Sequence, residues 1–183
     1  MTNILGISGS LRKASFNTRL LHAAAALAPE GVSFMGMTIE GIPLYNQDVE
    51  EADGIPPAVT ALKEAIRAAE GVLLVTPEYN NSMPGVFKNA IDWASRPPRE
   101  SAGVFRGRKF ALIGASPGGF GTILSQNAWL PVLRTLEVDL WTSGRLMLSR
   151  AGQAFAEDGS LADPEQQAQL KRYLAGFTAF VQG

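Results

Sequence analysis

The sequence contains no cysteine and only one histidine, His22. Disulfide bonds, thiolate metal sites and cysteine nucleophiles are therefore excluded. A single histidine also gives poor support to a histidine-ligated metal centre or to serine–histidine hydrolysis. Because His22 falls inside a helical pattern, we interpret it as a helix-surface or packing residue, and we expect no metal site.

The sequence also lacks a strong charge of either sign and a long hydrophobic run. Its 16 basic and 17 acidic side chains leave a net charge of −1, which gives no electrostatic footprint for nucleic acid or for an anionic membrane. No apolar stretch reaches the roughly 18 residues of a membrane span, and no signal-peptide pattern precedes the first apolar run. We therefore expect a soluble, cytoplasmic protein that binds neither nucleic acid nor membrane.

What is present is the composition of a globular protein, with 46% hydrophobic and 18% charged residues. A chain of 183 residues fits one domain and buries roughly 70% of its unfolded surface. No internal repeat and no low-complexity linker divides it, so we expect residues 1–183 to form a single domain. The polar, proline-rich stretch 97–103 is interpreted as a surface loop.

Short apolar runs alternate with helical patterns along the whole chain. Strands are expected at residues 4–8, 32–37, 71–76, 110–115 and 138–142. Continuous runs such as Val72–Val75 suit strands that are covered on both faces of a parallel sheet. Apolar residues recur at helical spacing in segments 20–27, 59–69, 86–93, 129–136 and 170–181.

This alternation predicts an α/β protein with a five-stranded parallel sheet, helices on both faces and right-handed crossovers. The flavodoxin-like strand order 2-1-3-4-5 gives a three-layer sandwich with a switch point between strands 1 and 3. Ligands of such folds bind beyond the carboxyl ends of the strands at that point. The loops after strands 1, 3 and 4 are therefore the places to look for a site.

The loop after the first strand, residues 8–17, combines a glycine with hydroxyl, amide and guanidinium groups directly before a helical pattern. Unpaired N–H groups and the helix dipole favour an anion at such a helix start. Ser10, Ser15 and Asn17 would add hydrogen bonds, and Arg12 would add a positive charge. Alternatively, Ser15 or Asn17 is only an N-cap and Arg12 only makes the loop soluble.

Two further loops are expected at the same sheet edge. Residues 76–85 combine turn-forming residues with groups that would hydrogen-bond the edge of a flat heterocycle. Residues 116–122 contain three glycines, which permit close approach of the backbone to a ligand. Ordinary turns are the alternative for both loops, with Tyr79 only covering the core.

The common nucleotide-binding fingerprints are missing. The chain has no G-x-G-x-x-G after its first strand and no G-x-x-x-x-G-K-[ST] anywhere. A dinucleotide-dependent dehydrogenase and a P-loop NTPase therefore both lose support. The interpretation that remains is a mononucleotide phosphate held by hydroxyl groups and backbone amides.

Two long segments make a resemblance specific. Residues 9–17 resemble the phosphate loop of the NADPH-dependent FMN reductase family, and residues 76–93 resemble its flavin-ring loop with the following helix. Segments 42–46 and 116–119 are also similar, and the resemblance weakens beyond about residue 122. That family has a flavodoxin-like fold and includes flavin-dependent quinone, chromate and azo-dye reductases.

The resemblance implies a set of FMN-binding residues. Around the phosphate it places Ser10, Arg12, Ser15, Phe16 and Asn17. Against the isoalloxazine or ribityl groups it places Pro77, Glu78, Tyr79 and Asn80, with Ser116 and Gly118 on the other side. Several of these contacts would come from the backbone, so that alanine at Glu78 would be silent. Arg12 would alternatively reach the phosphate of a second nucleotide.

The implied activity is hydride transfer from NADPH or NADH to bound FMN and then to a quinone-like, metal-oxyanion or azo acceptor. One site used twice predicts ping-pong kinetics, and no catalytic side chain is expected because flavin hydride transfer needs no general acid or base. The resemblance also implies a homodimer or homotetramer with the flavin near a subunit boundary. Trp93, Trp129 and Trp141 would lie in that contact or, equally, in the core.

Two other classes of function stay open. A flavodoxin-type electron carrier would bind FMN without pyridine-nucleotide activity, although the weak net charge argues against docking on basic redox partners. A flavin-binding interaction or structural protein is the third interpretation.

Overall fold

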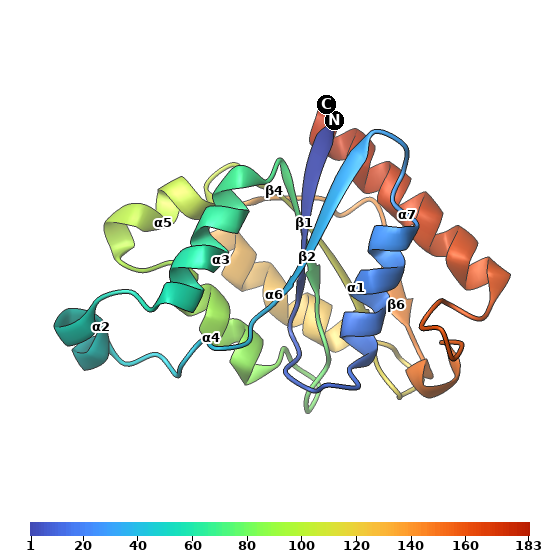
Figure 1. The fold of residues 1–183 in the computed structure, drawn as a ribbon, viewed down its shortest axis with the longest axis horizontal. Helices are drawn as coiled ribbons and strands as arrows, with labels where there is room; N and C mark the ends of the chain where they lie inside the picture. Colours follow the sequence, from blue (N-terminus) through green and yellow to red (C-terminus); the bar gives the residue numbers. More distant parts are fainter.

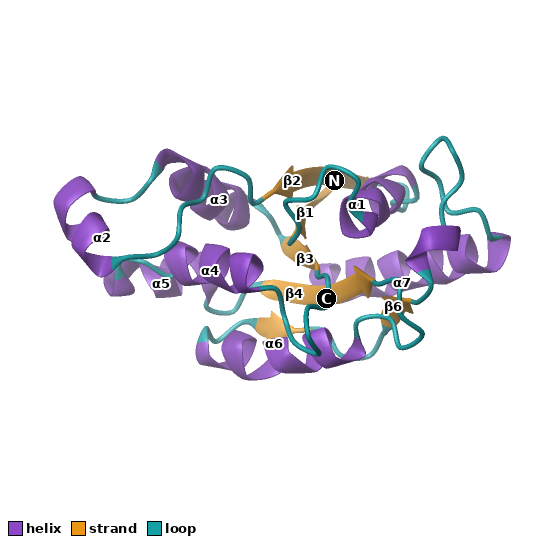
Figure 2. Cartoon of the chain, turned by 90° about the horizontal axis from the view of Figure 1, so that it is seen from below, coloured by secondary structure: helices purple, strands orange, loops and turns teal.

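A parallel β-sheet runs through the middle of the computed structural model, which describes residues 1–183. The strand order is β2-β1-β3-β4-β5, and a sixth strand, β6, also pairs with β4. Figure 1 shows the sheet between two groups of helices, and Figure 2 shows these groups on its opposite faces. The predicted α/β fold, its flavodoxin-like strand order and its parallel pairing are therefore confirmed.

The strands are β1 (Thr2–Ser8), β2 (Val32–Thr38), β3 (Gly71–Val75), β4 (Lys109–Ala115), β5 (Asp139–Leu140) and β6 (Leu146–Leu148). The helices are α1 (Phe16–Ala26), α2 (Gln47–Asp53), α3 (Pro57–Ala68), α4 (Gly85–Ala94), α5 (Pro98–Phe105), α6 (Ile123–Thr135) and α7 (Pro164–Gln182), with a 3₁₀ turn at Ala151–Gln153.

The apolar strands send alternate side chains to the two faces of the sheet. In β3, Leu73 and Val75 join a cluster with α1 and α7, whereas Val72 and Leu74 join a second cluster with α3, α4, α5 and α6. All four are fully buried. This is why the run shows no polar alternation, since both faces are covered.

The register brings the ends of the central strands together. Ser8 at the end of β1 lies level with Val75 at the end of β3, and Val75 lies level with Ile113 of β4. The loops after these strands therefore leave the sheet at one edge. The chain termini lie at the other end (Figure 1), where Gln182 Nε2 donates a hydrogen bond of 2.9 Å to Thr2 Oγ1.

The fifth strand departs from the sequence prediction. A continuous strand at 138–142 was expected, but β5 pairs with β4 only at Asp139–Leu140, and the chain returns to β4 as β6. Between them, the Trp141 ring packs edge-on against Tyr173 of α7, with 4.8 Å between the ring centroids. Burial of this indole against α7 accounts for the departure of the backbone from β4.

Two helices were not predicted. The interpretation of residues 97–103 as a loop is wrong, because α5 begins at Pro98 and buries Val104 and Phe105. Proline is favoured at the first position of a helix, so the same residues that indicated a loop serve as a helix start. Helix α2 has no buried residue, so its sequence shows no apolar residues at helical spacing from which it could be predicted.

The single histidine and the tryptophans can now be placed. His22 lies on the exposed surface of α1, as predicted. Trp93 and Trp129 are fully buried, so both belong to the core rather than to a subunit contact, and Trp141 is partly buried against α7. None of the helices combines the length and hydrophobicity that a membrane crossing requires.

Helix α5, which was not predicted, supplies the ion-pair partner of the nearly buried Lys63. Lys63 of α3 lies 2.7 Å from Glu100 Oε2 of α5 and also donates to the Arg96 carbonyl at 2.5 Å. The hydrogen bond from Lys63, assisted by Arg67, lowers the pKa of Glu100 below its usual value of 4.5. Because the pKa is lower in the folded state than in the unfolded chain, the ionised carboxylate stabilises the folded state at pH values above the usual pKa of 4.5. This stabilisation is lost as the pH falls through the folded-state pKa.

We therefore expect Glu100→Gln to lower the free energy of unfolding more at pH 7 than at pH 3.5. At pH 7 the variant leaves the Lys63 ammonium without its carboxylate partner, whereas at pH 3.5 the wild type has lost part of that pair as well. Urea unfolding at both pH values measures the difference. Glu165→Gln, which removes an ion pair with Arg172 that is largely exposed, is the matched control. Equal pH dependence in the two variants would contradict this account.

Candidate functional site

The loops after β1, β3 and β4 enclose a cleft of about 240 Å³ at the carboxyl edge of the sheet. It is lined by Ser10, Arg12, Ser15, Phe16, Asn17, Pro77, Glu78, Tyr79, Ala115, Ser116 and Pro117. Nine of the eleven residues named from the sequence are in this set. Ala115 and Pro117 were missed, although both adjoin the predicted Ser116. Asn80 and Gly118 do not line the cleft.

The start of α1 presents hydroxyl groups to the cleft. Ser15 caps the helix, because its Oγ accepts hydrogen bonds from the backbone N–H groups of Asn17 (3.2 Å) and Thr18 (3.3 Å). Ser10 Oγ accepts from the Arg12 N–H at 3.3 Å. Both serines are buried, and each hydroxyl hydrogen remains free to donate to a ligand. The capping interpretation of Ser15 is correct, and it is compatible with anion binding.

Asn17 joins two of the three loops. Its Nδ2 donates to the Ala115 carbonyl at 2.8 Å, and its Oδ1 accepts from the Ala115 N–H at 2.9 Å. The pair is buried and spans 98 residues of sequence. One side chain therefore holds the first turn of α1 against the end of β4, which positions the cleft. A single Nδ2 hydrogen remains for a ligand.

Arg12 provides a positive charge at the rim of the cleft. Its guanidinium lies 4.9 Å from the centroid of the Phe16 ring and donates to the Ala14 carbonyl. The side chain is exposed, and no carboxylate neutralises it. Phe16 in turn stacks on Phe155, with 6.3 Å between centroids and 2° between ring planes. Arg12 thus makes a cation–π contact with Phe16, and its charge stays available to an anion.

Glu78 connects the loop after β3 to the start of α6. Its Oε2 accepts hydrogen bonds from the N–H groups of Leu124 (2.9 Å) and Ser125 (3.0 Å). Thr122, at the N-cap position of α6, makes no capping hydrogen bond of its own. The carboxylate of Glu78 therefore caps this helix from a distant loop, where the helix dipole also favours a negative charge.

Beyond Glu78 the loop forms a tight turn. The backbone N–H groups of Tyr79 and Ser82 each donate to the other residue's carbonyl, at 3.0 and 3.1 Å. Asn80 and Asn81 between them have φ angles of 49° and 62°, the left-handed conformation of a type I′ turn that asparagine tolerates. Tyr79 is 49% exposed at the cleft, whereas Asn80 forms the tip of the turn.

The loop after β4 is fastened to the segment that follows β6. Ser116 Oγ donates to the Gly121 carbonyl at 2.6 Å, and the Ser116 carbonyl accepts from the Ala151 N–H at 3.0 Å. The Gly118 carbonyl accepts from the Arg150 N–H at 3.0 Å. Gly118 therefore pairs with the segment that follows β6, and it does not line the cleft.

The cleft as a whole suits the phosphate and flat ring of a mononucleotide. It combines the start of an 11-residue helix, two free hydroxyl hydrogens and one arginine that no carboxylate neutralises. The Glu78 carboxylate accepts hydrogen bonds from the start of α6. No group of three or more histidine, aspartate or glutamate side chains is arranged to hold a metal ion.

A parallel sheet of this order, with a polar cleft at its switch point, defines a flavodoxin-like α/β protein. Among solved structures, the flavoenzyme NAD(P)H:(acceptor) oxidoreductase FerB from Paracoccus denitrificans superposes with a TM-score of 0.89. It is 34% identical, and the match covers 100% of this chain and 98% of that one.

Residues 2–153 match the model of the NADPH-dependent FMN reductase family. An NAD(P)H-dependent FMN reductase of Pseudomonas aeruginosa is 46% identical over 178 residues, which are 97% of this chain and 94% of that protein. A 2-hydroxy-1,4-benzoquinone reductase of a Burkholderia species is 39% identical over 175 residues, which are 96% and 93% of the two chains. The chain belongs to the NADPH-dependent FMN reductase family and is a reductase of that class.

The cap that Glu78 provides gives its side chain a structural role in addition to the backbone contact with flavin that the sequence predicts. Loss of a helix cap costs about 1 kcal/mol, so we expect Glu78→Ala to lower the free energy of unfolding by about that amount. Glu78→Gln keeps an acceptor oxygen and should lose less. Urea unfolding measures both, with the exposed Glu40→Ala as control. A Glu78→Ala variant as stable as the wild type would show that the cap contributes nothing.

Proposed function

We propose that this protein is an FMN-dependent NAD(P)H oxidoreductase that reduces small quinone-like acceptors. The single observation that carries the proposal is the cleft itself. Nine residues that the family resemblance assigns to FMN lie together at the switch point of a flavodoxin-like sheet. Membership of the reductase family then favours this activity over mere flavin binding.

In this proposal the phosphate of FMN binds at the start of α1. The hydroxyl groups of Ser10 and Ser15 donate to it, and Arg12 supplies the compensating charge. The guanidinium of Arg12 lies over the ring of Phe16. The Asn17–Ala115 hydrogen bonds hold these donors in place, so that little conformational freedom is lost on binding.

The flavin ring would lie between the loops after β3 and β4. Pro77, Glu78 and Tyr79 would face it on one side, mainly through the backbone, with Ser116 and Pro117 on the other. Bound FMN supplies the hydride chemistry, and the protein supplies binding, orientation and electrostatics. We assign no side chain as general acid or base. NADPH or NADH and the acceptor would use the open face of the cleft in turn, which gives ping-pong kinetics.

The acceptor class is proposed from the relatives. One is named for a hydroxylated benzoquinone and another, from Pseudomonas putida, is named a quinone reductase. Quinones are therefore favoured here over metal oxyanions and azo compounds. The use of NAD(P)H also agrees with a cytoplasmic setting.

We further propose that the protein is a homodimer or homotetramer. Three large apolar side chains at the end of the loop after β4 and the start of α6 are exposed: Phe120 (85%), Ile123 (39%) and Leu124 (42%). Adjacent exposed apolar side chains are typical of subunit contacts. Sedimentation velocity on the purified protein distinguishes the two states from a monomer.

The proposed activity is tested by anaerobic mixing of the FMN-loaded protein with NADPH. We expect the visible absorbance of the flavin to bleach, whereas an electron carrier without pyridine-nucleotide activity would leave it unchanged. Addition of a benzoquinone should then give steady NADPH consumption, far above the rate with the same amount of free FMN. A rate equal to that of free FMN would favour a protein that only binds flavin.

The phosphate site generates a separate prediction. Charge-assisted hydrogen bonds contribute ~1.5–3 kcal/mol each, so Arg12→Ala combined with Ser15→Ala should raise the dissociation constant of FMN at least roughly tenfold. Quenching of FMN fluorescence on binding measures this constant. Arg12→Ala alone keeps the helix cap, and Lys13→Ala removes a neighbouring charge as control. Unchanged FMN retention in the double variant would show that the phosphate binds elsewhere.

A further inference from the structure

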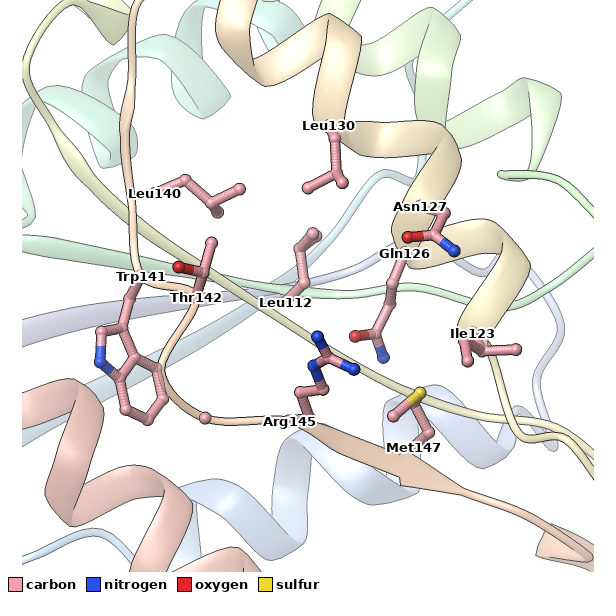
Figure 3. Close-up of a pocket in the computed structure, with 11 residues that line it drawn as sticks. Leu112, Ile123, Gln126, Asn127, Leu130, Leu140, Trp141, Thr142, Arg145 and Met147 are labelled. Atoms are coloured by element: carbon pink, nitrogen blue, oxygen red, sulfur yellow. The ribbon is translucent and has the colours of Figure 1, made fainter.

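A second cavity, of about 160 Å³, lies between α6 and the segment that joins β5 to β6. Leu112 of β4, Leu130 of α6 and Leu140 of β5 give it an apolar lining (Figure 3). This cavity and the FMN cleft share no lining residue. The proposed oxidoreductase activity gives this cavity no role.

Arg145 places a positive charge in the cavity. Figure 3 shows its side chain extending from the β5–β6 segment into the space between the apolar side chains. The side chain is exposed and makes no ion pair or hydrogen bond, and no aspartate or glutamate lines the cavity. An arginine without a carboxylate partner next to apolar surface is suited to bind an anion that carries an apolar body.

Uncharged polar groups accompany the arginine at the same cavity. The side chains of Asn127 and Thr142 form no hydrogen bond within the protein. Gln126 donates from Nε2 to Thr122 Oγ1 and to the Leu146 carbonyl, both at 3.0 Å. These bonds fix the amide, and its Oε1 stays free. The cavity thus combines one cation and several unused polar groups with an apolar floor, the usual composition of a small-molecule site.

The wall of the cavity near Trp141 is held from two sides. A Cβ atom on Gly144 would lie 2.3 Å from the indole ring, and one on Gly176 of α7 would lie 2.8 Å from it. Both positions therefore need glycine to leave room for the ring. The indole is packed between the β5–β6 segment and α7, and this packing fixes the segment that carries Arg145.

We propose that this cavity binds a small aromatic monocarboxylate. Arg145 would pair with the carboxylate, Asn127 and Thr142 would complete its hydrogen bonds, and the ring would lie on Leu112 and Leu130. The ring of such a ligand fits, because a cavity of about 150 Å³ accommodates benzene. A neutral quinone would form no ion pair with the arginine, so this ligand class differs from the proposed acceptor.

Calorimetric titration of the FMN-loaded protein with benzoate tests the proposal. We expect saturable binding that Arg145→Gln weakens at least tenfold. Arg150→Gln, which removes another exposed arginine that lies outside the cavity, should leave the affinity unchanged. Benzyl alcohol keeps the ring without the carboxylate and should bind at least tenfold more weakly than benzoate. Benzoate should bind with the same affinity to the protein without FMN, which separates the cavity from the FMN cleft.

Three results would overturn the proposal. The first is the absence of benzoate binding, or binding that Arg145→Gln leaves unchanged. The second is benzoate binding only in the absence of FMN, which would place the anion in the FMN cleft. The third is a change in sedimentation velocity of Arg145→Gln without any benzoate binding to the wild type, which would assign the arginine to a contact between copies of the chain. None of these results depends on reductase activity, so the proposed function stands or fails separately.

Discussion

The two hydrogen bonds between the Asn17 side chain and the backbone of Ala115 determine where the site is built. They connect the first turn of α1 with the end of β4, across 98 residues of sequence. A parallel sheet brings strand ends to one edge, but it leaves the loops beyond them free to separate. The buried side-chain amide of Asn17 removes that freedom, because its NH2 group and its oxygen are both hydrogen-bonded to Ala115. Separating the two loops would leave these buried polar groups without partners. The serine hydroxyls and Arg12 then face a cleft of defined width.

Much of the fold was predictable because the apolar runs and helical faces are local signals. The order of the sheet, the parallel pairing and the loops that enclose the cleft follow from strand patterns together with the rule that ligands bind at the switch point. The individual site residues came from the resemblance to the reductase family, and nine of them line the cleft. The missed elements lack such a signal. Helix α2 buries no residue, and the Pro97–Pro98 pair of α5 is as typical of a turn as of a helix start. The division of the last strand depends on Trp141 packing against α7, which is a tertiary contact.

The roles of individual site residues were less predictable than their positions. Glu78 was expected to act through its backbone, yet its carboxylate caps α6, 46 residues further along the chain. No local pattern marks that partner, because Thr122 is itself a residue type that commonly caps helices, although it makes no capping hydrogen bond here. The adjacent Asn80 and Asn81 could have indicated a left-handed two-residue turn, since asparagine is among the few residues that tolerate this conformation. Such a reading would have placed Asn80 at the tip of the turn.

The cap that Glu78 supplies to α6 also has a consequence for motion. The N–H groups at the start of that helix have no local acceptor, so they are protected only while the loop after β3 stays in place. Fraying of the helix start and displacement of the loop are therefore one cooperative event, although the two segments are far apart in sequence. Any ligand that holds the loop would slow amide hydrogen exchange at Leu124 and Ser125, where it makes no contact at all.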